Sequence, residues 1–463
     1  MERTPIAKLK ESLGKEVKIS AWIDVRRDQG KLIFLDFRDF SGKVQGVILP
    51  NNNEAHATGS EVRPEWVVEV RGKVNPRPER AVQKDKFNGD IELEILQISV
   101  LNKAETPPFE VEGDGKEVSE EIRLRFRYID LRRERMKNNM VKRHEALQFV
   151  RNFYSKNGFL EIETPCLTKS TPEGSRDFLV PARIDPGKFY ALPQSPQQYK
   201  QFLMSAGFEK YFQIARCFRD EDTRGDRQPE FTQIDVETSF ENQKKIMQTS
   251  EDMLIAFVKT VFPNKKIQTE PFPRLSFKEA MKKYGTDKPD LREDKTDPDL
   301  LAFCWVIDFP FFERDDDGGW TFTHNPFSAP IESSMEDLAK KKNIGNIQAA
   351  QYDIVLNGYE IGGGGLRNHN PEALQKVFEI MGYSKEKIEN NFSHMLKALG
   401  SGTPPHGGIA FGFDRIMMLL LNEPNIRETI AFPKTGEGRD PLMDGPTVVV
   451  PDQLDELGIT LQE

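Results

Sequence analysis

The sequence is poor in the features that mark disulfide-stapled or zinc-stapled proteins. Its 463 residues include only three cysteines, Cys166, Cys217 and Cys304, which lie far apart and form no CxxC pair. This spacing excludes a disulfide framework, argues against a cysteine zinc site and fits a reducing cytoplasm. Six histidines without an HExxH pattern give no other zinc signature. We therefore expect a cytoplasmic protein without zinc.

Long apolar runs are missing as well. The longest useful one, residues 416–421, is far shorter than the ~18 residues that a membrane span needs, and residues 1–4 contain no apolar signal core. No membrane association is expected. The net charge of −9 excludes a uniformly basic coat for nucleic acid and leaves a local basic surface open. The length predicts two or three domains, and 32 Phe and 30 Pro argue against long disordered tracts.

The first hundred residues have the pattern of a small β-barrel. Apolar and polar residues alternate in short segments that are separated by glycine-containing breaks. The candidate strands are residues 17–23, 32–37, 44–49, 66–74 and 91–101. Five short strands in about 100 residues favour an OB-fold, and another small barrel without an RNA role is the alternative.

A change of composition follows the barrel. Residues 105–108, Glu-Thr-Pro-Pro, close the first unit, and the polar residues 110–121 indicate a hinge. Residues 122–143 carry nine Lys or Arg against two Asp or Glu, a run that either faces RNA phosphates or forms a solvated helix face. The predicted division is a barrel over 1–104, a linker over 105–137 and a third part over 138–463 with a C-terminal extension.

The third part is predicted to be α+β. Asn138 or Asn139 is expected to cap a helix that Gly158 ends. Further expected helices follow Ser195-Pro196 and cover 244–261, 371–381, 385–399 and 416–421. Expected strands cover 159–164, 211–218, 231–240, 303–309, 352–359 and 407–413. Strands joined locally pair antiparallel, so we expect an antiparallel sheet flanked by helices rather than a doubly wound parallel sheet.

A charged loop lies between two of these apolar strands. It carries three arginines, Arg219, Arg224 and Arg227, together with four acids. Arginine is well shaped for phosphate oxygens, and Phe231 could stack on a base. The alternative is an ordinary salt-bridged hairpin.

Two further stretches have nucleotide-site chemistry. Asp353 and Glu360 are seven residues apart, so a turn or bulge must intervene if both bind one Mg²⁺ ion. The glycines at 362–365 allow close backbone approach, and a flexible loop is the alternative. Asp414 and Arg415 follow a strand and precede a helix, where Arg415 could hold a nucleotide or form a buried pair with Asp414. Neither GxGxxG nor a P-loop is present.

Together these stretches resemble the three motifs of the class II aminoacyl-tRNA synthetases. Residues 158–165 resemble motif 1, residues 218–235 motif 2 and residues 412–415 motif 3. Further blocks resemble the bacterial-type aspartyl-tRNA synthetases more specifically. They are residues 171–177, 194–200, 227–238, 305–310 and 430–435.

The resemblance implies an OB-fold that binds the anticodon and a catalytic domain that forms a homodimer through motif 1. It implies two reaction steps: L-aspartate and ATP give aspartyl-adenylate and pyrophosphate, and the 3′-end of tRNA-Asp then accepts the aspartyl group. Mg²⁺ accompanies the ATP. Whether tRNA-Asn is charged as well stays open.

The resemblance also implies the site residues. Arg219 and Arg415 are the catalytic pair, with Arg219 on the α-phosphate. ATP-binding residues are Arg219, Glu221, Gln228, Phe231, Glu360, Gly412, Phe413, Asp414 and Arg415. Aspartate-binding residues are Glu173, Ser195 and Gln197 around the α-ammonium, Lys200, His324 and Arg367 around the side-chain carboxylate, and Arg219 and Asp235. Asp353 and Glu360 hold Mg²⁺, and Arg27, Phe34 and Gln45 contact the anticodon.

Two departures from the family pattern stand out. The bacterial-type enzymes carry an inserted domain that is essentially absent here, because Pro289 and Trp305, which flank its usual position, are only 16 residues apart. Asn325 stands where many relatives have a second histidine. Three other interpretations stay open: an asparaginyl relative, a catalytically inactive RNA-binding paralogue, and an amino-acid ligase that needs no tRNA.

Overall fold

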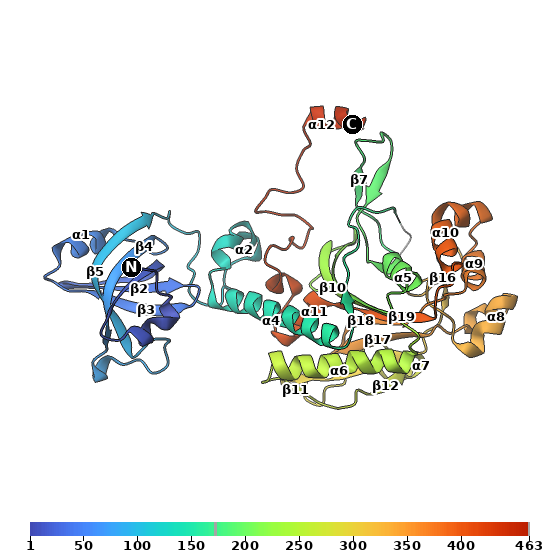
Figure 1. The fold of residues 1–463 in the computed structure, drawn as a ribbon, viewed down its shortest axis with the longest axis horizontal. Helices are drawn as coiled ribbons and strands as arrows, with labels where there is room; N and C mark the ends of the chain where they lie inside the picture. The colour runs from blue at the N-terminus through green and yellow to red at the C-terminus, as the bar shows by residue number, and fades with distance from the viewer. Residues whose placement is uncertain (171–173, 462–463) are drawn as a thin grey trace. The chain divides into compact units, whose positions relative to one another are not determined.

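The computed structural model describes residues 1–170 and 174–461, in two compact units that span Met1–Glu110 and Val111–Glu463 (Figure 1). None of the helices described in these ranges is long and apolar enough to cross a membrane.

The first unit is the predicted OB-type barrel. Its strands close in the order β1-β2-β3-β5-β4. They are β1 (Glu16–Gln29), β2 (Leu32–Asp39), β3 (Gly42–Ile48), β4 (Val67–Pro76) and β5 (Ile91–Asn102), with a 3-10 helix at Ile6–Ser12 and α1 (Asn53–Glu61). Alternation buries one side of each strand, as at Ile33, Leu35 and Phe37 of β2, which are fully buried in the barrel core.

The second unit is built on an eight-stranded sheet. In spatial order its strands are β12 (Arg274–Ser276), β14 (Phe303–Ile307), β17 (Gln351–Leu356), β18 (Tyr359–Leu366), β19 (His406–Gly412), β10 (Glu230–Ser239), β9 (Lys210–Phe218) and β6 (Leu160–Glu161). The five inner pairings are antiparallel, as predicted, and only the two edge pairs, β12 with β14 and β6 with β9, are parallel. The α+β prediction is therefore confirmed.

Helices and three small ribbons surround this sheet. The helices are α2 (Glu120–Arg125), α3 (Arg127–Asp130), α4 (Glu134–Lys156), α5 (Gln197–Ser205), α6 (Gln243–Val261), α7 (Phe277–Tyr284), α8 (Met335–Lys340), α9 (Pro371–Ile380), α10 (Lys385–Leu399), α11 (Phe413–Leu420) and α12 (Pro451–Leu457). The ribbons pair β7 (Leu179–Pro181) with β8 (Phe189–Ala191), β11 (Lys266–Ile267) with β13 (Leu300–Leu301), and β15 (Phe312–Arg314) with β16 (Trp320–Phe322).

Strand β10 shows how the sheet separates core from site. Ile234 and Val236 point into the apolar core, where α4 and α6 pack through Phe149 and Phe257 with ring centroids 5.7 Å apart. The alternate residues Gln233 and Asp235 line a polar cavity on the opposite face. The period of two along the strand therefore gives the sheet one apolar face and one chemical face.

Two predicted elements need correction. Helix α4 begins at Glu134, so Asn138 and Asn139 do not cap it; Asn139 lies inside the helix and donates to Glu423 at 2.7 Å. The strand predicted over 352–359 ends at Leu356, because Asn357 and Gly358, with φ of 51° and 87°, form a tight turn into β18.

The glycine run at 362–365 is a strand, so the flexible-loop alternative is wrong. A Cβ on Gly364 would lie 2.2 Å from the carbonyl oxygen of Gly408 and 2.7 Å from the ring of Tyr352. Glycine here allows β17, β18 and β19 to approach closely.

The basic run at 122–143 turns inward. Arg123, Arg127 and Arg133 are buried, so neither RNA phosphates nor solvent accounts for them. Glu428 is a hub of this cluster: its carboxylate accepts from Arg123 at 2.8 and 3.1 Å and from Arg135 at 3.0 Å. Burial alone would raise the pKa of Glu428, but the two arginines outweigh burial and lower it to about 2.

Replacing this hub is expected to destabilise the second unit. Glu428→Gln removes the close counter-charge of the buried Arg123, which then keeps only the 3.5 Å contact with Asp130, and breaking such a buried pair typically costs ~3–5 kcal/mol. Because the folded pKa is lowered, this contribution is present above pH 4.5 and is lost as the pH falls towards 2. Chemical denaturation at pH 7 measures the loss, with the exposed Glu437→Gln as control. Equal stability of the two variants would contradict this role of Glu428.

Candidate active site

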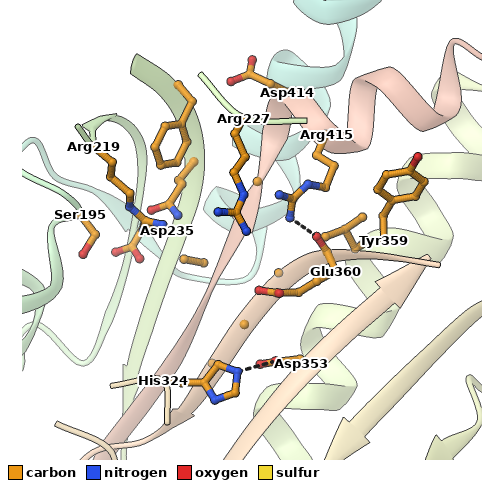
Figure 2. Close-up of a pocket in the computed structure, with 18 of the residues that line it drawn as sticks. Ser195, Arg219, Arg227, Asp235, His324, Asp353, Tyr359, Glu360, Asp414 and Arg415 are labelled. Atoms are coloured by element: carbon orange, nitrogen blue, oxygen red, sulfur yellow. Dashed lines mark hydrogen bonds and ion pairs between the residues drawn. The ribbon is translucent and has the colours of Figure 1, made fainter. Parts of the chain in front are cut away.

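A polar cavity of about 580 Å³ lies on the chemical face of the sheet. Its walls come from α5, β10, β17, β18 and the start of α11, together with the charged loop between β9 and β10. Figure 2 shows Arg219, Arg227 and Arg415 entering it from one side, with Glu360, Asp353 and His324 opposite. The predicted site residues that line it are Ser195, Gln197, Lys200, Arg219, Glu221, Gln228, Phe231, Asp235, His324, Asp353, Glu360, Arg367, Gly412, Asp414 and Arg415.

Arg415 joins three parts of the cavity wall. Its Nη1 donates to the carbonyl oxygen of Glu360 on β18, and its Nη2 donates to Asp226 of the charged loop at 3.0 Å. Asp414 is not its partner: that carboxylate lies 2.5 Å from Arg143 of α4 and accepts from the backbone of Thr232. The buried Asp414–Arg415 pair considered from the sequence is therefore wrong. Arg415 stays directed at the cavity.

Arg219 is placed beside an aromatic ring. Its guanidinium lies 5.1 Å from the centroid of Phe231, and its Nε donates to the carbonyl oxygen of Gln194 at 3.3 Å. Both side chains line the cavity. A guanidinium suits a phosphate and an aromatic ring suits a base, so the pair is typical of a nucleotide site.

The remaining predicted ATP residues have structural partners. Glu221 accepts from the Ser175 hydroxyl and lies 3.5 Å from Arg227, and the amide oxygen of Gln228 accepts from the backbone of Lys434 at 2.8 Å. Phe413 is fully buried in the core with Arg143 over its ring, and it is not among the residues that line the cavity. The salt-bridged hairpin and the cavity wall are thus the same loop.

Asp353 and Glu360 meet over Gly363. A Cβ on that glycine would lie 2.9 Å from Asp353 Oδ1 and 3.7 Å from Glu360 Oε1, so the glycine keeps the space between two carboxylates open. The hairpin turn and a register shift between Ile354 and Val355 place both acids on one side, which confirms the turn or bulge that their spacing required. Such a cradle fits a Mg²⁺ ion that takes its other ligands from phosphates and water.

The two acids of this cradle have pKa values that are shifted in opposite directions. Burial, reinforced by Glu360, raises the pKa of Asp353 well above its ordinary value. Burial would also raise the pKa of Glu360, but Lys288, whose Nζ lies 2.9 Å away, and Arg415 lower it. His324 lies 3.7 Å from Asp353, and burial lowers the pKa of its imidazole. Among the described residues no group of three or more His, Cys, Asp or Glu could hold a metal by itself.

The other end of the cavity holds a buried set of two cations and two carboxylates. Lys200 Nζ lies 2.7 Å from Asp235 and 3.2 Å from Glu237, and Arg367 binds Glu237 through Nε at 2.8 Å and Nη2 at 3.1 Å. Burial raises the pKa of Asp235; burial would do the same for Glu237, but Arg367 and Lys200 lower its pKa to about 2.

Glu237 was missed by sequence reasoning. It lies two residues after Asp235 on β10, so the alternation of the strand was a signal that both carboxylates share one face. Glu237 is therefore a second acid that, together with Asp235, balances the charges of Lys200 and Arg367.

Three predicted aspartate residues remain. Gln197 is buried at the start of α5, and its backbone N–H donates to the Ser195 hydroxyl at 3.3 Å. His324 lines the cavity with Lys200 and Arg367, yet its imidazole lies beside Asp353. Glu173 lies outside the described residues.

In the barrel, Arg27, Phe34 and Gln45 lie together on an outer face. Arg27 pairs with Phe34 across β1 and β2, and its guanidinium donates twice to Asp36 at 2.8 Å and once to Gln45 at 3.3 Å. Phe34 is half-buried between the core residues Ile33 and Leu35, so it is not a core aromatic. A ring beside amide and guanidinium donors suits an unstacked base.

Comparisons with known proteins agree with both units. Residues 119–436 match the family model "tRNA synthetases class II (D, K and N)", and residues 17–101 match "OB-fold nucleic acid binding domain". An aspartate–tRNA(Asp/Asn) ligase of Dehalococcoides mccartyi is 38% identical, with 98% of each chain covered. An aspartate–tRNA ligase of Listeria welshimeri is 40% identical over 97% of this chain and 96% of the relative. The chain belongs to the aspartate–tRNA ligase family of class II tRNA synthetases.

Solved structures support the family fold. Asparaginyl-tRNA synthetase from Pyrococcus horikoshii aligns with a TM-score of 0.73 at 21% identity, covering 94% of this chain and 98% of that one. A putative aspartyl-tRNA synthetase from Leishmania major gives 0.72 at 20% identity, covering 93% of each chain. The Dehalococcoides alignment runs over 587 positions against 463 residues here, so at least 124 positions have no counterpart in this member of the family. This length difference agrees with the absence of the inserted domain.

Proposed function

We propose that the chain is an aspartate–tRNA ligase that activates L-aspartate with ATP and transfers it to the 3′-end of tRNA-Asp. The observation that carries the proposal is the single cavity in which arginines and a carboxylate cradle at one end meet a buried donor cluster at the other. The first end suits a triphosphate with its metal, and the second suits a small dicarboxylic amino acid. An asparaginyl relative is less well supported, because the donor cluster favours a carboxylate.

At the nucleotide end, Arg219 and Arg415 act as the catalytic pair. Arg219 neutralises the charge that develops on the α-phosphate, and Arg415 holds the nucleotide against the wall that it already ties to Glu360 and Asp226. Phe231 stacks on the adenine, with Glu221, Gln228, Gly412 and Asp414 in that wall and Phe413 packed behind it in the core. The guanidinium of Arg219 lies 5.1 Å from the centroid of the Phe231 ring, so the cation and the ring lie together at the nucleotide end.

Mg²⁺ would be held by Asp353 and Glu360 and would neutralise the phosphates. Lys288 Nζ lies 2.9 Å from Oε2 of Glu360, so the other oxygen, Oε1, is the one that faces Asp353 over Gly363 and would hold the ion. The protein's own residues align the reactants: the substrate α-carboxylate attacks the α-phosphorus and pyrophosphate leaves. No side chain has to act as a covalent nucleophile.

At the amino-acid end, Lys200, Arg367 and His324 receive the side-chain carboxylate, and Asp235 orients Lys200. Glu173, Ser195 and Gln197 surround the α-ammonium. The two cations present only N–H donors to the substrate, which is the basis for choosing aspartate over asparagine.

The partners follow from the second step. tRNA binds with its anticodon on the Arg27–Phe34–Gln45 face. Two copies join through the motif 1 segment, residues 158–165, which contains β6; this strand ends the sheet and its Leu160 is exposed. We place the reaction in the cytoplasm. Purified tRNA-Asp and tRNA-Asn charged side by side decide whether one or both are substrates. Pyrophosphate exchange without any charging would indicate an amino-acid ligase that needs no tRNA, and binding of tRNA without exchange would indicate an inactive paralogue.

The anticodon face gives a prediction that separates the two steps. Phe34→Ala and Gln45→Ala should each weaken tRNA charging by ~1–3 kcal/mol through lost stacking or hydrogen bonding. ATP–pyrophosphate exchange without tRNA should stay unchanged, because neither side chain lines the cavity. Phe40→Ala, a 73% exposed phenylalanine of the same barrel, is the matched control. Loss of both activities together would instead show that the two residues stabilise the barrel.

A further inference from the structure

A chain of buried hydrogen bonds runs from the amino-acid end of the cavity into the protein. Nε2 of Gln197 donates to Oε1 of Gln201 at 3.0 Å, and Nε2 of Gln201 lies 3.1 Å from Nε2 of His406. Nδ1 of His406 lies 2.8 Å from the carbonyl oxygen of Pro404. The exposed fractions of Gln197, Gln201 and His406 are only 5%, 1% and 2%. Among these three residues, only Gln197 lines the cavity.

The contact between His406 and the carbonyl oxygen of Pro404 determines which group donates and which accepts in every hydrogen bond of this series. A backbone carbonyl only accepts, so Nδ1 of His406 carries the proton and Nε2 of the neutral ring must accept. That acceptor requires the NH₂ group of Gln201, which turns the Gln201 oxygen towards Gln197. Gln197 must then offer its own NH₂ group. The group of Gln197 that is left for a ligand is its carbonyl oxygen.

We infer that Gln201 and His406 are positioning residues that hold the carbonyl oxygen of Gln197 towards the α-ammonium of the bound amino acid. The inference rests on the proposed function of the cavity. An ammonium group has three donors and no acceptor, so a Gln197 turned by 180° would set NH₂ against NH₃⁺. A freely rotating amide would present the correct oxygen only part of the time.

A second proton on the His406 ring would reverse the direction of these hydrogen bonds. With both ring nitrogens donating, Gln201 must turn its oxygen to the ring and its NH₂ group to Gln197, which then shows its own NH₂ group to the ligand. The charged groups that face His406 are Glu237 of β10, which favours the protonated ring, and Arg367 and His369, which oppose it. Burial is the largest influence and lowers the pKa of His406 below the ordinary 6.5, so the correct orientation holds at neutral pH.

Two substitutions on different elements test this role. Gln201→Met on α5 and His406→Phe on β19 keep the side-chain volume but remove the hydrogen bonds that orient Gln197. Each should raise the KM for aspartate on the order of tenfold in pyrophosphate exchange, the loss of one oriented hydrogen bond to a charged group, and leave the KM for ATP within about twofold. Gln201→Glu should restore the KM for aspartate, because one carboxylate oxygen accepts from the NH₂ group of Gln197 while the other accepts from Nε2–H of a protonated His406.

The unmodified enzyme provides a measurement that does not depend on a variant folding. Its KM for aspartate should rise as the pH falls below 6.5 while its KM for ATP does not, and the rise should be absent in His406→Phe. Parallel rises in both KM values, or an unchanged KM for aspartate in folded Gln201→Met and His406→Phe, would overturn the inference. Absence of aspartate-dependent exchange in the unmodified chain would instead refute the proposed function itself.

Discussion

Arg219→Ala is expected to reduce aspartate-dependent pyrophosphate exchange by ~10²–10³-fold, or about 3–4 kcal/mol in the transition state. Negative charge grows on the α-phosphate oxygens as the aspartate α-carboxylate attacks the phosphorus, and a guanidinium is a well-shaped donor for it. The loss should fall on kcat more than on the KM for ATP, because the contact strengthens in the transition state.

The fold should survive this substitution. Within the described residues the side chain of Arg219 makes one 3.3 Å hydrogen bond, to the carbonyl oxygen of Gln194, and lies beside the ring of Phe231; its backbone hydrogen bonds to Pro229 and Glu221 do not depend on the side chain. Arg216→Ala is the matched control: it removes an arginine of β9, three residues before Arg219, that bonds Glu230 at 3.0 Å and is not among the residues that line the cavity. Near-normal exchange in folded Arg219→Ala, or an equal loss in Arg216→Ala, would contradict the assigned role.

Lys200→Met is expected to lower the rate of aspartate activation at least ~100-fold. The much weaker activation of asparagine should change little. The two amino acids have nearly the same shape, so charge must separate them. Nε and Nη2 of Arg367 are occupied by Glu237, which leaves Nη1 for a ligand, and two of the three Lys200 hydrogens face Asp235 and Glu237. The remaining N–H groups of Lys200 and Arg367 can only donate hydrogen bonds. The NH₂ group of asparagine is also a donor, so it finds no acceptor there.

The unmodified enzyme should therefore prefer aspartate by at least ~10²-fold, since an amide NH₂ set against N–H donors loses hydrogen bonds to charged groups that are worth ~1.5–3 kcal/mol each. Lys188→Met, which removes a 72% exposed lysine paired with Asp185, is the control. Because Lys200→Met leaves Asp235 without its cation while Glu237 keeps Arg367, thermal unfolding must be measured beside exchange. Arg367→Lys gives a second variant that keeps the charge but loses the fork. Comparable exchange with both amino acids in the unmodified enzyme would refute these assignments.

Local patterns predicted most of the fold. The alternation of β9 and β10 predicted their antiparallel pairing, and Gly158, with φ of 80°, follows the end of α4 as expected. The start of α4 was mispredicted because it depends on contacts distant in sequence. No side chain caps that end at Arg133, while Arg135 and Asn139 both bond Glu423, which is more than 280 residues away.

The site was predictable where its residues lie in recognisable blocks, and less so between them. Lys288 pairs with Glu360, a partner 72 residues further along the chain, so no local pattern could indicate the contact. Gln201 and His406 likewise meet only through the packing of α5 against β19. Glu237, by contrast, could have been predicted from the alternation of β10, because it lies two residues after Asp235 on that strand.

The most direct test of the account is the charging of purified tRNA-Asp by the purified chain with ATP, Mg²⁺ and each of aspartate, asparagine and lysine, the three amino acids of this synthetase group. We predict that aspartate alone becomes esterified to the 3′-end, with AMP and pyrophosphate as products. Charging with asparagine or lysine in place of aspartate, or no charging by a preparation that exchanges pyrophosphate, would contradict it.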